Sequence, residues 1–177
     1  MNAFSLVIKK DFFEKSLAIA IVFFALLLGA GVRPFFLVIL AAILLAKDLE
    51  NGKYRMILTF PVKRWQLHVS WYFLGVAIIT VSVMVSAGVR GSSSFLVDWA
   101  KSISYFAFMY GLASVTAQKG LGNFLFPFLV FIVDAGLSAS LVYSRYSLLN
   151  HASVVPYLVS AGMYFVSLYV FSKEGSV

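Results

Sequence analysis

The sequence has no cysteine among its 177 residues and only two histidines. The lack of cysteine excludes disulfide bonds, thiolate metal sites and cysteine nucleophiles. Charged residues are also scarce, at 12%, and the 7 acidic residues are outnumbered by 14 basic ones. Little material is left for a catalytic or metal centre.

A nucleotide-binding loop is lacking as well. Gly52-Lys53 has no upstream glycine at the spacing of a phosphate loop, and Tyr54 replaces the hydroxyl residue that would hold magnesium. His68 and His151 fall on opposite sides of the membrane in the topology predicted below, so they cannot share a metal or act as one dyad. The sequence therefore predicts no enzymatic activity and no cofactor bound by this chain.

Apolar residues are abundant instead. They make up 62% of the chain, with 18 phenylalanines, which is more than a soluble domain of this size can bury. Basic residues at helix ends beside anionic lipid account for the net charge of +7, so nucleic acid is not an expected partner. We expect a single transmembrane domain over residues 1–177, with the lipid bilayer as its solvent.

The apolar runs predict an all-α integral membrane protein with six transmembrane helices, because a spanning helix needs about 20 apolar residues. In chain order the predicted spans are 16–32, 35–50, 69–89, 96–117, 121–143 and 152–171. An N-terminal interfacial helix is predicted for residues 3–14, where Phe4, Ile8 and Phe12 share one stripe.

The distribution of basic residues orients these spans. With both termini in the cytoplasm, ten basic residues lie inside and four outside, as the positive-inside rule requires. The four outer ones are Arg33, Arg90, Lys101 and Arg145. The sequence thus predicts a multi-pass protein of the cell membrane.

One long polar interruption, residues 47–68, lies between the second and third predicted spans and holds five basic residues. Within it Tyr54, Ile57 and Leu58 share one face of a short helix, which Pro61 would end. Such a helix suits a groove on a soluble partner. An interfacial helix resting on anionic lipid fits the same charges.

The same stretch carries a family resemblance. Glu50-Asn51-Gly52, followed by residues 57–65 with the sequence Ile-Leu-Thr-Phe-Pro-Val-Lys-Arg-Trp, resembles the cytoplasmic loop of ABC exporter permeases of the type-2 family. In that family an acidic residue and a glycine precede a short coupling helix, and a Pro-Val-x-Arg run leads into the third span. The match is close over about twenty residues and loose over the six-span layout.

The resemblance implies a permease that pairs with a second copy or a close relative, as a homo- or heterodimer. Each permease would dock on a separate ATP-binding subunit, which would hold the ATP and magnesium. The coupling helix implied by the resemblance offers the partner Tyr54, Met56, Ile57, Leu58 and Phe60. The joint that transmits movement would be shaped by Glu50, Gly52, Pro61 and Arg64.

The chain departs from the family pattern at Lys53-Tyr54, where a small hydroxyl residue often follows the glycine, and in its short length. Outer re-entrant helices, which the family has between its last two spans, would have to be built from residues 134–150. The fifth span would then end near Val133.

Asp134 is the only carboxylate within an apolar run and away from its ends. Burial in hydrocarbon is costly, so this side chain needs a partner or water. It is a candidate either for a polar pathway or for the cap of a re-entrant turn near Ala135-Gly136.

An alternative function remains open at this point: a ligand-binding membrane module, such as the vitamin-capturing subunit of an energy-coupling-factor importer. It would need polar contacts gathered at the outer face. The sequence offers Arg90, Asp98, Lys101 and Arg145 for them. For the exporter, the weakly charged, aromatic spans favour an amphipathic or hydrophobic substrate.

Overall fold

The computed structural model describes residues 3–29, 31–50, 63–90, 94–151 and 153–173, and every regular element within them is helical. In chain order these elements are α1 (Ala3–Leu27), α2 (Arg33–Ala41), η1 (Ala42–Ala46), α3 (Lys47–Glu50), α5 (Arg64–Arg90), α6 (Phe95–Gln118), α7 (Leu125–Ala139), η2 (Ser144–Tyr146) and α8 (Val155–Lys173). Here η1 is a π-helical segment and η2 a 3-10 turn.

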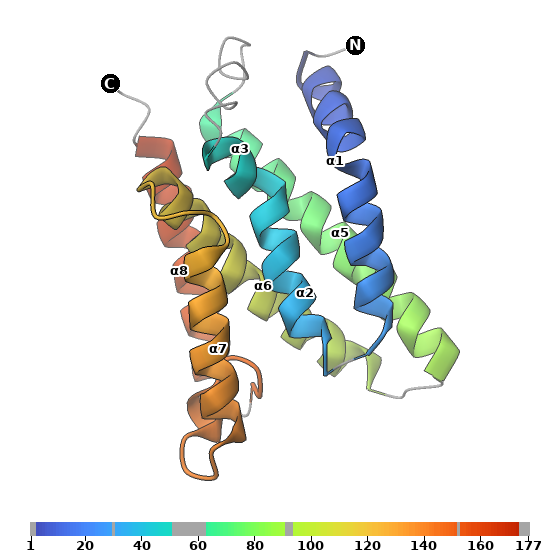
Figure 1. Ribbon diagram of the computed structural model, residues 1–177, viewed down its shortest axis with the longest axis vertical. Coiled ribbons are helices and arrows are strands. Elements are labelled where there is room, and N and C mark those ends of the chain that lie inside the picture. Colours follow the sequence, from blue (N-terminus) through green and yellow to red (C-terminus); the bar gives the residue numbers. More distant parts are fainter. Residues whose placement is uncertain (1–2, 30, 51–62, 91–93, 152, 174–177) are drawn as a thin grey trace.

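Helix α6 is the centre of the bundle and packs against α8, α2 and α5, while α1 packs against α5 and α2 (Figure 1). The start of α1, the end of α3, the start of α5 and the end of α8 lie together, at what we call the connector end. The turn between α1 and α2, the start of α6 and residues 140–151 lie toward the opposite end, called here the cavity end.

The first reversal of the chain depends on a glycine. Gly29 adopts a φ of 147°, which L side chains rarely adopt, and α1 ends just before it at Leu27. Helix α2 then begins at Arg33, with Pro34 in its first turn, where proline's missing N–H costs nothing.

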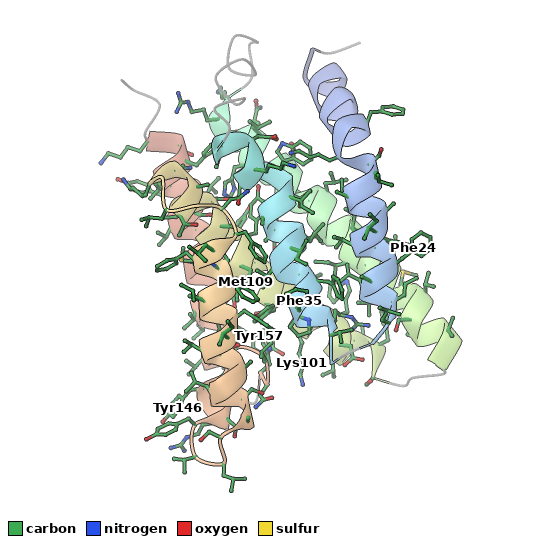
Figure 2. All side chains as sticks on the ribbon, in the orientation of Figure 1. Phe24, Phe35, Lys101, Met109, Tyr146 and Tyr157 are labelled. Atoms are coloured by element: carbon green, nitrogen blue, oxygen red, sulfur yellow. The ribbon has the colours of Figure 1, made fainter. Side chains whose placement is uncertain are left out.

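Apolar side chains are divided between a core and a large outer surface. Trp71, Phe106 and Tyr110 are fully buried at the centre. Helix α1, by contrast, exposes a stripe at helical spacing, and Figure 2 shows one of its members, Phe24, pointing away from the bundle. The stripe consists of Phe13, Leu17, Ile21, Phe24 and Leu28, each at least 60% exposed. So much exposed apolar surface is typical of a protein that contacts lipid or another protein.

The prediction of six transmembrane helices is wrong for the described residues. Two helices are long and apolar enough to cross a membrane, Arg64–Val89 and Val155–Lys173. Only 28% and 22% of their most apolar windows are buried, whereas the core helix of a soluble protein is mostly buried. The structure therefore supports a protein with two possible membrane-crossing helices.

The missing spans fail for identifiable reasons. The apolar part of α1, Lys15–Leu27, and helix α7 with its 15 residues are both too short to cross. Helix α2 ends after 9 residues because a π-helical segment follows from Ala42, and the backbone of Leu44 within it is not helical. Helix α6 has 24 residues, but it includes Asp98, Lys101 and several hydroxyl side chains, which lower its hydropathy.

Two further elements of the predicted fold have different outcomes. A separate interfacial helix over residues 3–14 is not present, because α1 runs unbroken from Ala3 to Leu27; the segment has no proline or glycine to end a helix. The predicted coupling helix, residues 54–60, lies outside the described residues.

Candidate functional site

The candidate site lies at the connector end, around the end of α3 at Glu50 and the start of α5 at Arg64. Its first feature is a break in the second hydrophobic run. Leu44, inside η1, has a ψ of −112°, so the helix is kinked between α2 and α3. A kink frees backbone carbonyls from the helical ladder, and π-helical segments are frequent at functional positions.

Two side chains from other parts of the chain satisfy the freed carbonyls. The Lys15 ammonium, from α1, donates a hydrogen bond to the Leu44 carbonyl at 2.6 Å. The Asn123 amide, from the turn before α7, donates to the Ala42 carbonyl at 3.3 Å. The kink is thus held by contacts with α1 and with the segment that precedes α7.

Lys15 also forms a buried ion pair. Its Nζ lies 2.5 Å from Asp48 Oδ2 in α3, and the two side chains are only 9% and 5% exposed. The same ammonium stands 4.4 Å from the centre of the Trp71 ring in α5, a cation–π contact. One lysine therefore joins α1 to the kink, to α3 and to α5. Its partner Asp48 lies two residues before the end of α3 at Glu50.

A second buried cluster lies near the start of α5. His68, in the second turn of α5, contacts the rings of Tyr110, Tyr164 and Phe171 at centroid distances of 5.0, 5.5 and 5.6 Å. The Tyr110 hydroxyl donates to the His68 carbonyl at 2.8 Å. These contacts connect the beginning of α5 with α6 and α8.

The hydrogen bonds of Ser167 favour one tautomer of His68. With the Ser167 hydroxyl donating to the Tyr164 carbonyl at 2.9 Å, its oxygen is left to accept from His68 Nε2 at 2.9 Å. This arrangement favours the tautomer with its hydrogen on Nε2. His68 is a buried packing and hydrogen-bonding residue, and among the described residues no group of three or more His, Asp or Glu side chains could hold a metal ion.

The predicted joint residues flank these two clusters. Glu50 ends α3 and Arg64 begins α5, where its side chain is half-buried. The other predicted residues of the coupling helix and joint lie outside the described residues: Gly52, Tyr54, Met56, Ile57, Leu58, Phe60 and Pro61.

Asp134 is buried in α7 and holds a turn. Its Oδ1 accepts a hydrogen bond from the Leu148 amide at 2.8 Å, and its Oδ2 accepts one from the Leu149 amide at 3.0 Å. The carboxylate thereby fixes the chain after η2 against α7. Helix α7 ends at Ala139, six residues beyond Val133.

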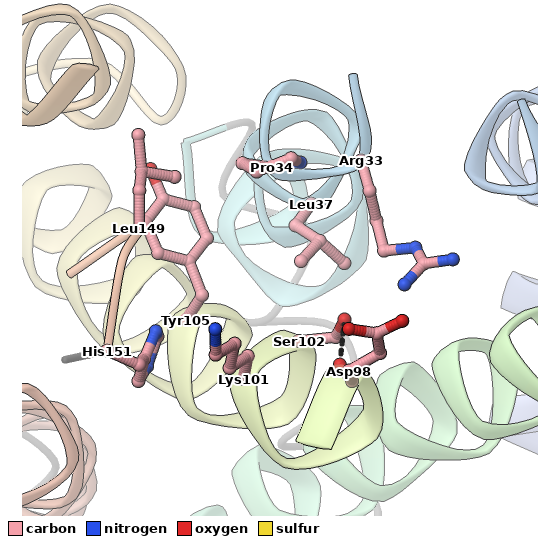
Figure 3. A pocket seen from close by; sticks show the side chains of 9 residues that line it. All are labelled: Arg33, Pro34, Leu37, Asp98, Lys101, Ser102, Tyr105, Leu149 and His151. Carbon is pink, nitrogen blue, oxygen red and sulfur yellow. Dashed lines mark hydrogen bonds between the residues drawn. The ribbon is translucent and has the colours of Figure 1, made fainter. Parts of the chain in front are cut away.

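The cavity end holds a polar pocket, shown in Figure 3, between the start of α2, the first half of α6 and the segment after η2. Its volume is about 170 Å³. The lining residues are Arg33, Pro34, Leu37, Asp98, Lys101, Ser102, Tyr105, Leu149 and His151. Two of the four residues offered for an outer-face ligand site, Asp98 and Lys101, meet here, while Arg145 is exposed elsewhere and the Arg90 side chain is outside the description.

A second hollow lies between α6 and α8, beside Tyr72 of α5, and has a volume of about 360 Å³. Its walls are largely apolar and aromatic, with Tyr72, Trp99, Tyr157, Tyr164 and Phe165 among them. The Tyr72 and Tyr164 rings stand 4.3 Å apart. A groove of this kind suits an apolar chain or ring better than a charged group.

The central residues of the connector-end site, Lys15 and Asp48, were not predicted as functional. Lys15 counted only as a basic residue flanking the first apolar run, and Asp48 as part of the polar interruption. Their separation by 33 residues hides the contact in sequence. The available signal was that each is a charge beside an apolar run, which requires a partner when buried.

Comparisons with known proteins add no further constraint: neither a family model, nor a curated protein sequence, nor a solved structure matches this chain.

Proposed function

We propose that this chain is the membrane-spanning permease subunit of an ABC exporter, moving an amphipathic or hydrophobic substrate across the cell membrane. A separate ATP-binding subunit, which holds ATP and magnesium, supplies the energy. The chain has no ATPase of its own. The pattern from Glu50 to Trp65 is the basis of this proposal in the sequence.

The observation that carries the proposal is the anchoring of both flanks of residues 51–62. Before the segment, Asp48 is tied to Lys15 and through it to α1 and Trp71. After it, His68 is tied to Tyr110 and Ser167, on α6 and α8. A force applied to residues 51–62 by a soluble partner would therefore be transmitted to α1, α5, α6 and α8, because closely packed buried contacts deform little.

The exposed surface is consistent with a membrane subunit that also pairs with another chain. The apolar stripe of α1 and the exposed apolar residues of α5 and α8 have to be covered by lipid or protein. A second permease copy or a close relative would share this surface with the bilayer. Both chain termini would lie in the cytoplasm, on the side of the ATP-binding subunit.

The apolar groove between α6 and α8 supports an amphipathic or hydrophobic cargo. It is lined largely by aromatic and apolar side chains, which suit a molecule dissolved in the membrane. Tyr164 lines the groove and also packs against the His68 ring. Movement at the connector end would therefore change its shape.

The direct test is co-purification with the ATPase encoded beside this chain. We expect the native chain to bring down the ATPase and an Ile57→Asp/Leu58→Asp variant to lose it, because two carboxylates would sit on the face that docks. The matched control is Leu121→Asp/Ser172→Asp, which puts two aspartates on exposed positions, one just after α6 and one in the last turn of α8. Equal recovery of the ATPase with both variants, or none with the native chain, would refute the proposal.

A further inference from the structure

The kink in the second apolar run is not explained by its own sequence. Residues 35–50 contain no proline or glycine, and the π-helical segment reads Ala-Ile-Leu-Leu-Ala, residues that suit an α-helix. Kinks without proline or glycine arise at π-bulges or where a side chain inserts into the helical ladder. A straight α-helix from Arg33 to Glu50 is therefore compatible with the local sequence.

Contacts from outside the run hold the kink. The Lys15 ammonium donates to the Leu44 carbonyl at 2.6 Å. The Asn123 amide donates to the Ala42 carbonyl at 3.3 Å. The Leu44 side chain is fully buried, and its Cδ1 lies 3.1 Å from where a Cβ on Gly75 would stand, so the glycine in α5 leaves room for it. The neighbours of the run, rather than its own residues, thus select the kinked conformation.

Straightening the run would change the register of α3. A π-bulge holds one residue more than the α-helical turn that it replaces. Without the bulge, each residue after it would turn by about 100° around the helix axis, which is one position at 3.6 residues per turn. Each residue of α3 would then take the place of the residue that now follows it.

This change of register exchanges the charge that faces Lys15. Asp48 faces it now, 2.5 Å from the ammonium, and both side chains are nearly enclosed. In the straight register Lys47, which is now exposed, would stand at that place and bring two ammonium groups together. The ion pair therefore favours the kinked register, and the repulsion between the two lysines opposes the straight one.

We propose that residues 42–46 form a register switch between a kinked and a straight helix, and that the Lys15–Asp48 ion pair selects the kinked state at rest. Entering the straight state breaks the ion pair and returns the Leu44 carbonyl to the helical ladder. Residues 51–62 follow α3 directly in the sequence, so a partner that turns them acts on the switch. This use in transport rests on the proposed function, whereas the two registers do not.

The test exchanges two adjacent residues in the isolated full-length protein, in detergent and without any ATPase. Lys47→Asp/Asp48→Lys keeps the composition and the net charge. It places a lysine against Lys15 in the kinked register and an aspartate there in the straight one, so it should shift the protein to the straight register. Lys47→Gln changes only the exposed residue and should leave the protein kinked, because Asp48 still meets Lys15 there.

A single cysteine reports the register, since the chain has none of its own. Ala46 is fully buried now and would take the exposed place of Lys47 in the straight register. Ala46→Cys should react slowly with a small maleimide in the native and Lys47→Gln backgrounds, and at least tenfold faster in the exchanged background. The control is Leu67→Cys, at a buried position in the first turn of α5, which should stay slow in all three backgrounds.

Fast labelling at residue 46 with protection at residue 67 supports the switch. The proposal is overturned if the exchange leaves residue 46 as protected as it is in the native background. It is also overturned if both positions become reactive, because the exchange has then opened the connector end instead of changing the register of one helix. The ATPase is absent throughout, so a failure here leaves the co-purification test of the proposed function unaffected.

Discussion

The two ends of the bundle treat buried charge in opposite ways. At the connector end, Lys15 meets Asp48 at 2.5 Å and the Leu44 carbonyl at 2.6 Å, and both side chains are almost fully enclosed. At the cavity end, Arg33, Asp98 and Lys101 line an open volume, and the buried Tyr105 hydroxyl makes no hydrogen bond among the described residues.

The two ends thus differ in how firmly they hold their charged groups. A closed ion pair fixes two helices in one relative position, because any shift leaves a charge buried without a partner. The ion pair at the connector end therefore joins α1 firmly to α3, whereas the polar groups at the cavity end leave an open volume between them.

Truncating one member of each cluster should give the largest contrast. Lys15→Ala leaves Asp48 buried without its main counter-charge and should cost about 3–5 kcal/mol of folding free energy. Tyr105→Phe removes a hydroxyl that has no partner among the described residues, so it should leave stability unchanged or slightly raised. Thermal unfolding in detergent measures both.

A double variant sharpens this prediction. Lys15→Met/Asp48→Leu replaces the ion pair by apolar side chains of similar size, which is often nearly neutral for stability. It should therefore recover most of what Lys15→Ala loses. If Lys15→Ala unfolds like the native protein, or the double variant is as unstable as the single one, the ion pair does not hold the connector end.

Between the two ends, α5 exposes apolar side chains. If α5 crosses the membrane, a charged residue among them should oppose its insertion. Val81, near the middle of α5, is 50% exposed. Val81→Asp should oppose membrane insertion by about 2.5–3.5 kcal/mol, the range for a charge at the centre of a spanning helix. The measurement is the fraction of protein that stays in carbonate-washed membranes, with Leu121→Asp as the exposed control. Equal fractions would show that α5 does not cross.

At the cavity end, Asp134 should matter locally. Asp134→Asn keeps the size of the side chain but leaves only one oxygen for two amide donors, so we expect a loss of about 1.5–3 kcal/mol, the worth of hydrogen bonds to a charged group. Hydrogen exchange at the Leu148 and Leu149 amides should accelerate. Arg145→Gln, exposed in the same segment, should not change it. Unchanged exchange in the Asn variant would contradict the capping role.

The contact between α6 and α8, which links the two ends, should be sensitive to a single methyl group. A Cβ at Gly111 would stand 2.8 Å from the Met163 carbonyl oxygen, which is backbone and cannot rotate away. Gly111→Ala should therefore cost about 1–3 kcal/mol through overpacking. Gly162→Ala, on α8 with open space around it, should instead gain up to about 1 kcal/mol in helix propensity. A stable Gly111→Ala protein would mean that the two helices separate easily.

The sequence located helices better than it located membrane crossings. Residues 69–89 and 96–117 were expected as spans, and α5 and α6 cover them, because long apolar runs between glycine or polar breaks define a helix well. The six-span prediction failed because apolar content alone does not reveal the kink at Leu44 or the early end of α7 at Ala139. Backbone geometry of that kind depends on tertiary contacts.

The candidate sites were predictable only in part. Asp134 was identified because a lone carboxylate in an apolar run requires a partner, but the partners, Leu148 and Leu149, are backbone amides that no side-chain pattern reveals. Asp98 and Lys101 were named as possible ligand contacts, yet Arg33, Tyr105 and His151 join them only through folding. Contacts between residues distant in sequence carry no local signal.

The most direct test of the account asks what touches the connector. Because the chain has no cysteine, a Leu58→Cys variant can be labelled there alone with a short thiol-reactive photo-crosslinker, and Leu121→Cys can serve as the control at the same end. In membranes that contain the neighbouring ATPase, we predict a crosslink from residue 58 to the ATPase and none from residue 121. A residue-58 label that reacts only with lipid, or equal crosslinking from both positions, would contradict the assignment of this chain as a permease driven by a docked ATPase.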